Sequence, residues 1–349
     1  MQNPPPILPG GRKPVGASAA ALVQTSPLTA DGPLPLLVTP AAAGVDLALW
    51  AEAQRDLVES HLHEHGGVLF RGFALRDVAA FERFVAAVAG ELLEYTNRST
   101  PRTQVSGNIY TSTEYPANLA IPMHNELSYC RSWPLKIAFF CVQPAAEGGE
   151  TPIADSRRVY QDVDPEVRDE LARKGILYVR NLGHGVDLPW QEVFQTEDRG
   201  QVERHCRREG IEIEWLAANR LRTRQVCQAV AVHPITGEAV WFNQAHLFHV
   251  SSLDPAAQEF LLEEYGEANL PRNTYYGDGS PIPLPVLEHI REVYARHSVA
   301  FRWQAGDVLL LDNMLVAHGR RPFHGARQVV VGMAQMQGVG VPSEAAAGS

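Results

Sequence analysis

The chain has 349 residues, of which 45% are hydrophobic and 20% are charged, a composition typical of a globular protein with a sizeable core. Its 40 acidic side chains outnumber the 30 Lys and Arg, and the resulting formal charge of −10 disfavours nucleic acid as a partner. The longest apolar runs are only of strand length and the proline-rich start lacks a signal-peptide pattern, so we expect a cytoplasmic protein that does not span a membrane.

Composition predicts a tail, one domain and a second tail. Residues 1–35 are rich in Pro, Gly and Ala without apolar periodicity, so we expect them to lie outside the fold. A single domain is expected over residues 36–340, because β-barrels and sandwiches decorated with helices often reach this length as one unit. Residues 341–349 are expected to form a C-terminal tail.

The chain then alternates between helical and strand-like patterns. One helix is predicted from Asp46 to the Gly66-Gly67 stop, then a strand at 67–73 and a helix ending near Gly90. Short apolar stretches broken by Pro, Gly and Asn indicate strands between 105 and 155. Further elements are expected in the remainder of the chain: strands at 176–182, 228–234 and 239–244, helices at 199–209, 254–266 and 283–297, and β-rich stretches at 304–320 and 327–336.

Strands surround the histidine-rich motifs, whereas helices crowd the N-terminal part and the inserts. This arrangement favours a mainly β fold with a double-stranded β-helix (jelly roll) core and flanking helices. No glycine-rich nucleotide-binding motif opens a helix, so an α/β nucleotide-binding fold has no support.

His124 and Glu126, in PMHNELSY, are separated by one residue and would share one face of a β-strand, where they could chelate one ion. His318, in VLLLDNMLVAHGRRPF, offers a third ligand. Two imidazoles and one carboxylate form the facial triad that leaves positions open on Fe(II) for catalysis. An H-x-E triplet also arises by chance, with a histidine that is only hydrogen-bonded. Support comes from the nearby GGETPIADSR and from Arg327, nine residues after His318, since a carboxylate co-substrate needs such an arginine.

Five motifs in order carry a resemblance over residues 65–337: PMHNELSY, GGETPIADSR, VWFNQAHLFH, YYGDGSPI and DVLLLDNMLVAHGRRPFHGARQVVV. Together they resemble the taurine-dioxygenase (TauD/TfdA-like) superfamily of Fe(II)- and 2-oxoglutarate-dependent oxygenases. Within it the chain looks most like the amino-acid hydroxylases found beside non-ribosomal peptide synthetases, including the syringomycin-pathway aspartyl hydroxylase type.

The resemblance implies that His124, Glu126 and His318 are the iron ligands. It also implies that Thr151, in GGETP, and Arg327, in HGAR, bind the distal carboxylate of 2-oxoglutarate, which suits the planar fork of a guanidinium. The superfamily's commonest carboxylate ligand is Asp, and the Glu found here resembles its clavaminate-synthase-like side.

The implied enzyme is a dioxygenase that uses Fe(2+), 2-oxoglutarate and O2. Its expected reaction is hydroxylation of an unactivated C–H bond in an amino acid, free or tethered as an aminoacyl group to a peptidyl carrier protein, in natural product biosynthesis. Desaturation, cyclisation and oxygenation of a taurine-like sulfonate stay open as alternatives. Outside this class stand a cupin-type metal enzyme that does not use 2-oxoglutarate and a non-catalytic binding protein.

Four residues are candidates for substrate contact: Arg98, Arg102, Arg320 and His246. Each arginine could instead be ordinary surface charge, and His246, in QAHLFH, could instead belong to the core or a pocket wall. The HLHEH tract at 61–65 ends the first predicted helix, where the helix dipole suits cations, so we expect no metal there. The four cysteines form no C-x-x-C pair, as expected in a reducing compartment.

Overall fold

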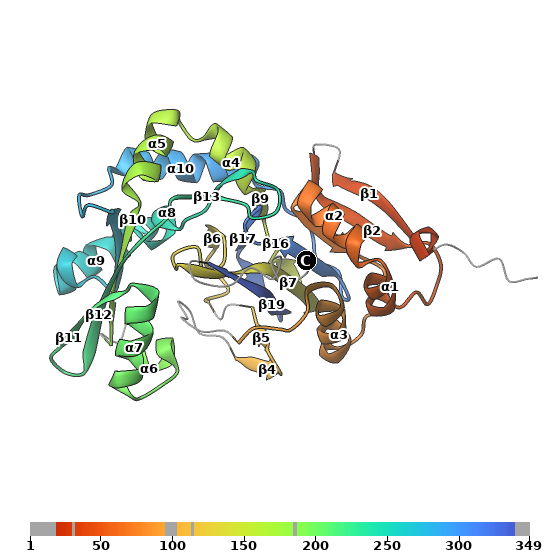
Figure 1. Cartoon of the computed structure of the whole chain (residues 1–349), viewed down its shortest axis with the longest axis horizontal. Helices are drawn as coiled ribbons and strands as arrows, with labels where there is room; N and C mark the ends of the chain where they lie inside the picture. Colours follow the sequence, from red (N-terminus) through yellow and green to blue (C-terminus); the bar gives the residue numbers. More distant parts are fainter. Residues whose placement is uncertain (1–18, 30–31, 95–102, 113–114, 184–186, 339–349) are drawn as a thin grey trace, which may run out of the picture.

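The computed structural model describes residues 19–29, 32–94, 103–112, 115–183 and 187–338. A central eight-stranded sheet, ordered β1-β2-β3-β16-β7-β19-β5-β4, dominates the fold (Figure 1). Its strands are β1 (Val23–Thr29), β2 (Gly32–Pro40), β3 (Gly67–Phe70), β4 (Gln104–Ser106), β5 (Ile109–Thr111), β7 (Ser132–Gln143), β16 (Val308–Asp312) and β19 (Gln328–Gly338). All neighbours pair antiparallel except β2 and β3.

A three-stranded sheet, ordered β6-β17-β9, packs with one face of the central sheet in a shared core. Its strands are β6 (Ile121–His124), β9 (Ile153–Asp155) and β17 (Val316–Arg320). A short antiparallel pair is formed by β8 (Glu147–Gly148), which precedes β9 in the chain, and β18 (Phe323–His324), which follows β17. These two layers form the jelly-roll core, which confirms the predicted fold class.

Helices cover the other face of the central sheet. They are η1 (Ala19–Leu22), α1 (Leu47–Ala53), α2 (Arg55–His65) and α3 (Val78–Ala89). The alternation of β7 explains the two-sided packing, because Ala138 and Phe140 face these helices whereas Ile137 and Phe139 face the three-stranded sheet. Phe140 stacks on Phe81 of α3 at 5.4 Å between ring centroids.

The remaining elements form an insert between β9 and β16, on the left and top in Figure 1. Its strands make a sheet ordered β11-β12-β10-β15 and a separate β13-β14 pair. They are β10 (Ile176–Leu182), β11 (Glu212–Leu216), β12 (Arg220–Cys227), β13 (Val230–Val232), β14 (Ala239–Trp241) and β15 (Arg272–Tyr276). The helices are α4 (Ser156–Asp162), α5 (Pro165–Lys174), α6 (Trp190–Phe194), α7 (Arg199–Glu209), α8 (Ala245–Phe248), η2 (Val250–Ser252), α9 (Pro255–Tyr265), η3 (Glu267–Asn269) and α10 (Leu284–His297).

The structure corrects the predicted tail over residues 1–35. Residues 1–18 lie outside the described part, but β1 and the start of β2 belong to the central sheet. Leu34, Leu36 and Val38 are buried on β2, and β1 forms the sheet edge, where proline is tolerated because edge strands leave backbone donors unpaired. Composition had concealed this apolar alternation. The C-terminal tail at 341–349 also lies outside the described residues.

Several element predictions differ in detail; the strands expected at 67–73 and 239–244, for example, are limited to Gly67–Phe70 and Ala239–Trp241. The helix predicted from Asp46 is divided at Gln54, whose backbone (φ −122°, ψ 30°) is not helical. The break lets α1 pack on α3 while α2 packs on β2 and β3. The strand predicted at 228–234 is shortened to Val230–Val232.

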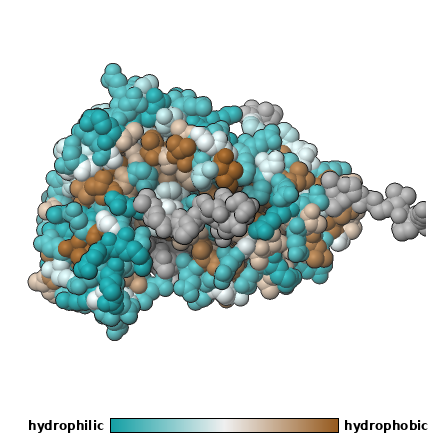
Figure 2. Space-filling view, viewed as in Figure 1, coloured by the Kyte–Doolittle hydropathy of each residue, from teal (hydrophilic) through white to brown (hydrophobic). Residues whose placement is uncertain are grey.

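None of the described helices is both long and apolar enough to cross a membrane. On the face drawn in Figure 2, apolar side chains form small separate groups among hydrophilic ones.

Candidate active site

The three predicted metal ligands converge between β6 and β17. His124 ends β6 and lies directly opposite His318 in the antiparallel register, with ring centroids 4.5 Å apart. One ligand atom from each of His124, Glu126 and His318 lies within 4.8 Å of the other two. Glu126 and His318 are buried, at 3% and 5% exposure, so water competes weakly for an ion held there. This donor set fits Fe(II).

The sequence predicted that Glu126 would lie on a β-strand together with His124. In the structure it does not. Strand β6 ends at His124, and Glu126 stands in the turn that follows, before Leu127 with a left-handed φ of 56°. The turn is held from far along the chain, because the Glu126 N–H donates to Asn313 Oδ1 at 2.7 Å. The same-face argument was therefore wrong in its geometry, although the three groups do come together.

Hydrogen bonding defines how His124 can bind a metal. Its Nδ1 lies 2.8 Å from the carbonyl oxygen of Pro122, which can only accept, so Nδ1 carries the proton and Nε2 presents a lone pair. His318 is oriented by packing, with its ring edge-to-face against Phe139 at 5.1 Å. Both imidazoles are thus held in place by the β-sheet framework.

Thr151 and Arg327 line the same cavity as His124 and His318. The Trp303 indole N–H donates to Thr151 Oγ1 at 3.2 Å, which leaves the threonine hydroxyl proton available to an acceptor in the cavity. Arg327 donates from Nε to the Gly149 carbonyl at 3.0 Å and from Nη1 to Ser112 Oγ at 3.2 Å. A carboxylate placed here would meet a fixed guanidinium and a hydroxyl.

Arg327 is a partly buried cation, and desolvation, followed by repulsion from Arg320, lowers its pKa to about 10. Among the described residues, no acidic side chain forms an ion pair with it. The GGET motif makes room for this arginine, because a Cβ on Gly149 would lie 2.9 Å from Arg327 Cδ and its φ is +72°. The arrangement fits an anionic ligand such as the distal carboxylate of 2-oxoglutarate.

Two of the four candidate substrate residues lie within the described part of the chain. Arg98 and Arg102 lie outside the described residues. Arg320 lines the cavity, but its guanidinium donates to the carbonyls of residues 115, 116 and 119, a loop-holding role. His246 is buried, and its Nε2 donates to the Met123 carbonyl at 2.9 Å. It therefore contacts the residue that precedes the predicted ligand His124.

The HLHEH tract differs from expectation in one respect. His61, Glu64 and His65 also bring one ligand atom each within 4.8 Å of one another. The Glu64 side chain is 69% exposed, so water competes for any ion there, whereas Glu126 and His318 of the other group are buried. Of the two groups, His124, Glu126 and His318 are therefore the better candidate metal site.

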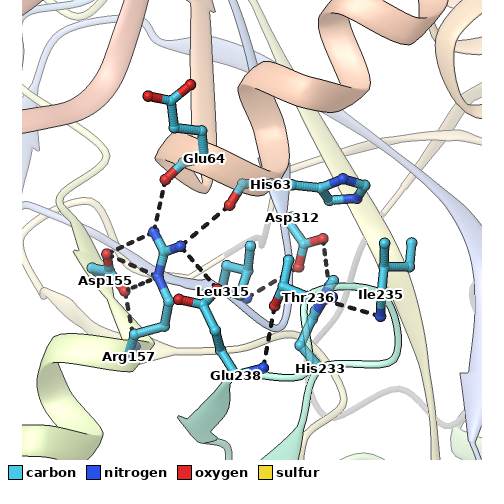
Figure 3. A network of polar contacts seen from close by, with 10 residues as sticks. All are labelled: His63, Glu64, Asp155, Arg157, His233, Ile235, Thr236, Glu238, Asp312 and Leu315. Carbon is cyan, nitrogen blue, oxygen red and sulfur yellow. Dashed lines mark hydrogen bonds and ion pairs between the residues drawn. The ribbon is translucent and has the colours of Figure 1, made fainter.

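A polar network around Asp312 went unrecognised in the sequence (Figure 3). The Asp312 carboxylate, at the end of β16, accepts from the N–H groups of Met314 and Leu315 at 2.9 and 3.0 Å and contacts His233 Nε2 at 3.0 Å. Arg157 joins the end of α2 to β9 by donating to the His63 carbonyl and pairing with Asp155. The network fixes the turn between β16 and β17, and β17 carries His318. The Asp-Asn pair before His318 was its only signal in the sequence.

Comparison with known proteins agrees with this geometry. The chain matches the family "Taurine catabolism dioxygenase TauD, TfdA family" over residues 25–334. It is 42% identical over 307 residues to the dapdiamide synthesis protein DdaC of Enterobacter agglomerans, covering 88% of this chain and 93% of that protein. It is 32% identical over 320 residues to a clavaminate synthase-like protein of Arabidopsis thaliana, covering 86% and 93%.

Solved structures share the fold at lower identity. PvcB of Pseudomonas aeruginosa matches with a TM-score of 0.54 at 18% identity, covering 93% of this chain and 94% of that one. AAD-2, solved with Mn(II) and N-oxalylglycine, matches with a TM-score of 0.53 at 13% identity, covering 89% and 96%. The family match spans most of the chain, and a relative well above 30% identity covers nearly all of it. The chain therefore belongs to the taurine catabolism dioxygenase TauD, TfdA family and is an iron- and 2-oxoglutarate-dependent dioxygenase.

Proposed function

We propose that His124, Glu126 and His318 bind the iron of this dioxygenase and that Thr151 and Arg327 bind the distal carboxylate of 2-oxoglutarate. One observation carries the proposal: two histidines of a triad of metal-binding groups line a cavity together with a partly buried arginine that forms no ion pair among the described residues. A cupin-type enzyme that does not use 2-oxoglutarate would not need the Thr151 and Arg327 pair.

The protein's own groups act by binding, orienting and shielding. His124 offers Nε2 because its Nδ1 proton is held by the Pro122 carbonyl, and Glu126 supplies the charge that favours a divalent cation. Arg327 and Thr151 fix one end of the co-substrate, so its other end is directed toward the triad. When bound, iron and 2-oxoglutarate supply the activation of O2 needed to oxidise a C–H bond.

For the substrate, we propose an amino acid, free or tethered as an aminoacyl group to a peptidyl carrier protein, that gains one hydroxyl group. The relative at 42% identity is a dapdiamide synthesis protein, which supports a role in natural product biosynthesis. Desaturation, cyclisation and sulfonate oxygenation would use the same site and are separated by product mass. A cytoplasmic location fits the four cysteines, which are all free and buried.

Two measurements test the proposal. Anaerobic addition of Fe(II) and 2-oxoglutarate should give a weak visible charge-transfer band, which should disappear in His124→Ala, Glu126→Ala and His318→Ala. A His61→Ala/His65→Ala double variant is the matched control and should keep the band, because those histidines belong to the other group, in which Glu64 is exposed. A triad variant with full iron binding and succinate formation would show that a ligand has been misassigned.

The substrate assignment is tested by mass. Free amino acids and the same residues thioesterified to a carrier protein are incubated with Fe(II), 2-oxoglutarate and O2. A product heavier by one oxygen is expected from at least one series. Efficient oxidation of taurine with no activity toward any amino acid in either form would overturn the assignment.

A further inference from the structure

The turn that carries Glu126 has no strand partner, so something else must hold it. We propose that Asn313, Gln244 and His246 are positioning residues that fix the backbone of residues 123–126 and thereby set the affinity of the metal site. The inference rests on the proposed role of Glu126 as a ligand. It reassigns His246 from substrate contact to support of the metal ligands.

Asn313 is the central member. It is fully buried, and its side-chain amide brackets Glu126: Oδ1 accepts from the Glu126 N–H at 2.7 Å and Nδ2 donates to the Glu126 carbonyl at 2.9 Å. Nδ2 also donates to the Pro134 carbonyl at 2.8 Å, which ties the bracket to β7. The Asn313 carbonyl in turn accepts from Asn125 Nδ2 at 2.7 Å. The amide thus imitates the pairing that a neighbouring strand would give.

Helix α8 supplies the second half of this support. Gln244 Nε2 donates to the Asn125 carbonyl at 2.8 Å, and its own N–H donates to Tyr178 Oη at 2.8 Å. His246 Nε2 donates to the Met123 carbonyl at 2.9 Å, and its ring packs against Tyr294 in a tilted arrangement, with centroids 4.8 Å apart. The carbonyls of residues 123, 125 and 126 are therefore each bound by a side chain from a distant part of the chain.

These contacts matter because Glu126 precedes Leu127, whose left-handed φ of 56° is unfavourable for a branched side chain. The surrounding bonds act together with the turn's own bonds from Ser128 to the Asn125 carbonyl to keep this shape and to aim the Glu126 carboxylate at the histidines. Groups that orient metal ligands in this way typically alter metal affinity by about 10- to 100-fold when they are removed. We expect a loss in this range for Asn313→Ala.

The experiment compares Asn313→Ala with Asn181→Ala. Asn181 is an equally buried asparagine whose Nδ2 donates to the Leu270 carbonyl at 2.7 Å and whose Oδ1 accepts from Arg222 Nε at 2.8 Å, in the insert sheet. Both variants should have a lower free energy of unfolding in denaturant titrations, because each loses buried hydrogen bonds. Only Asn313→Ala should weaken Co(II) binding, measured by chelator competition on the folded protein, and alter the visible Co(II) spectrum that reports ligand geometry.

Gln244→Ala gives a second, milder route in case Asn313→Ala does not fold, and it should weaken Co(II) binding by a smaller factor. Co(II) affinity and spectrum unchanged in Gln244→Ala and in any folded Asn313 variant would overturn the inference. Glu126→Ala tests the ligand assignment separately from the positioning role. Normal Co(II) binding in Glu126→Ala would refute the ligand assignment itself, whereas its loss there, together with unchanged positioning variants, would refute only the positioning role.

Discussion

Removing the Arg327 guanidinium should mainly damage the use of 2-oxoglutarate. A buried carboxylate that loses its cationic partner is destabilised by about 3–5 kcal/mol. Since each 1.4 kcal/mol changes an equilibrium constant tenfold, Arg327→Ala should raise the KM for 2-oxoglutarate by about 100-fold to a few thousand-fold. Succinate formation at varied 2-oxoglutarate measures the effect, and Arg321→Ala, an exposed neighbour of Arg320, is the control that should leave KM unchanged.

The pH dependence of the same step follows from the lowered pKa of Arg327, about 10. Below this value the guanidinium is protonated and binds the carboxylate, and as the pH rises through 10 the attraction is lost. Affinity for 2-oxoglutarate should therefore be level between pH 7 and 9 and weaken near pH 10, with a bound carboxylate moving the fall to higher pH.

An unchanged KM for 2-oxoglutarate in Arg327→Ala, with weaker binding of the primary substrate instead, would place Arg327 in the other pocket and refute this reasoning.

Three further changes probe the surroundings of this site. Trp303→Phe removes the hydrogen bond to Thr151 and should raise the KM for 2-oxoglutarate up to about tenfold, since one such bond contributes about 0.5–1.5 kcal/mol; no change would show that Thr151 needs no orienting partner. Arg320→Ala leaves three carbonyls without their donor and should lower the free energy of unfolding by about 2–4 kcal/mol in urea titrations, and a variant as stable as the wild type would contradict the loop-holding role. Gly149→Ala should weaken 2-oxoglutarate binding in the same succinate assay, because the new Cβ would displace Arg327; wild-type KM would show that the arginine can shift freely.

Local patterns predicted those parts of the fold whose ends are marked by local signals. The helix expected at 199–209 is α7 in the structure, because Asp198 caps the Gly200 N–H at 2.7 Å and Gly210 ends the helix in the left-handed region. The break at Gln54 had no such signal, since it arises from the different surfaces on which α1 and α2 pack. Pairing with a distant strand likewise placed β1 and β2 in the sheet despite their proline-rich composition.

The candidate site shows the same division. Spacing and motif order pointed to His124, Glu126 and His318, and the structure brings them together. The turn under Glu126 could not be predicted, because it depends on Asn313, which is 187 residues away. The role of His246 was hidden for the same reason, since its partner, the Met123 carbonyl, is 123 residues distant. Sequence spacing thus indicated the candidate ligand groups, whereas long-range hydrogen bonds determine how they are held.

The turn geometry also leads to a prediction for the length of the ligand side chain. Glu126→Asp keeps the charge but shortens the side chain by one methylene, and the Asn313 bracket on both backbone groups of residue 126 prevents the main chain from moving inward to compensate. Catalytic groups must be held within about 0.5 Å of their working position, and one methylene exceeds this tolerance. We expect Fe(II) affinity to fall at least tenfold, measured by chelator competition, with little change in the free energy of unfolding. Because Asn313→Ala weakens metal binding by itself, the comparison is made in that background: a Glu126→Asp/Asn313→Ala double variant that binds Fe(II) no more weakly than Asn313→Ala would show that the bracket causes the loss. A Glu126→Asp single variant that binds Fe(II) as tightly as the wild type would show instead that the turn adapts and that Asn313 does not fix the ligand.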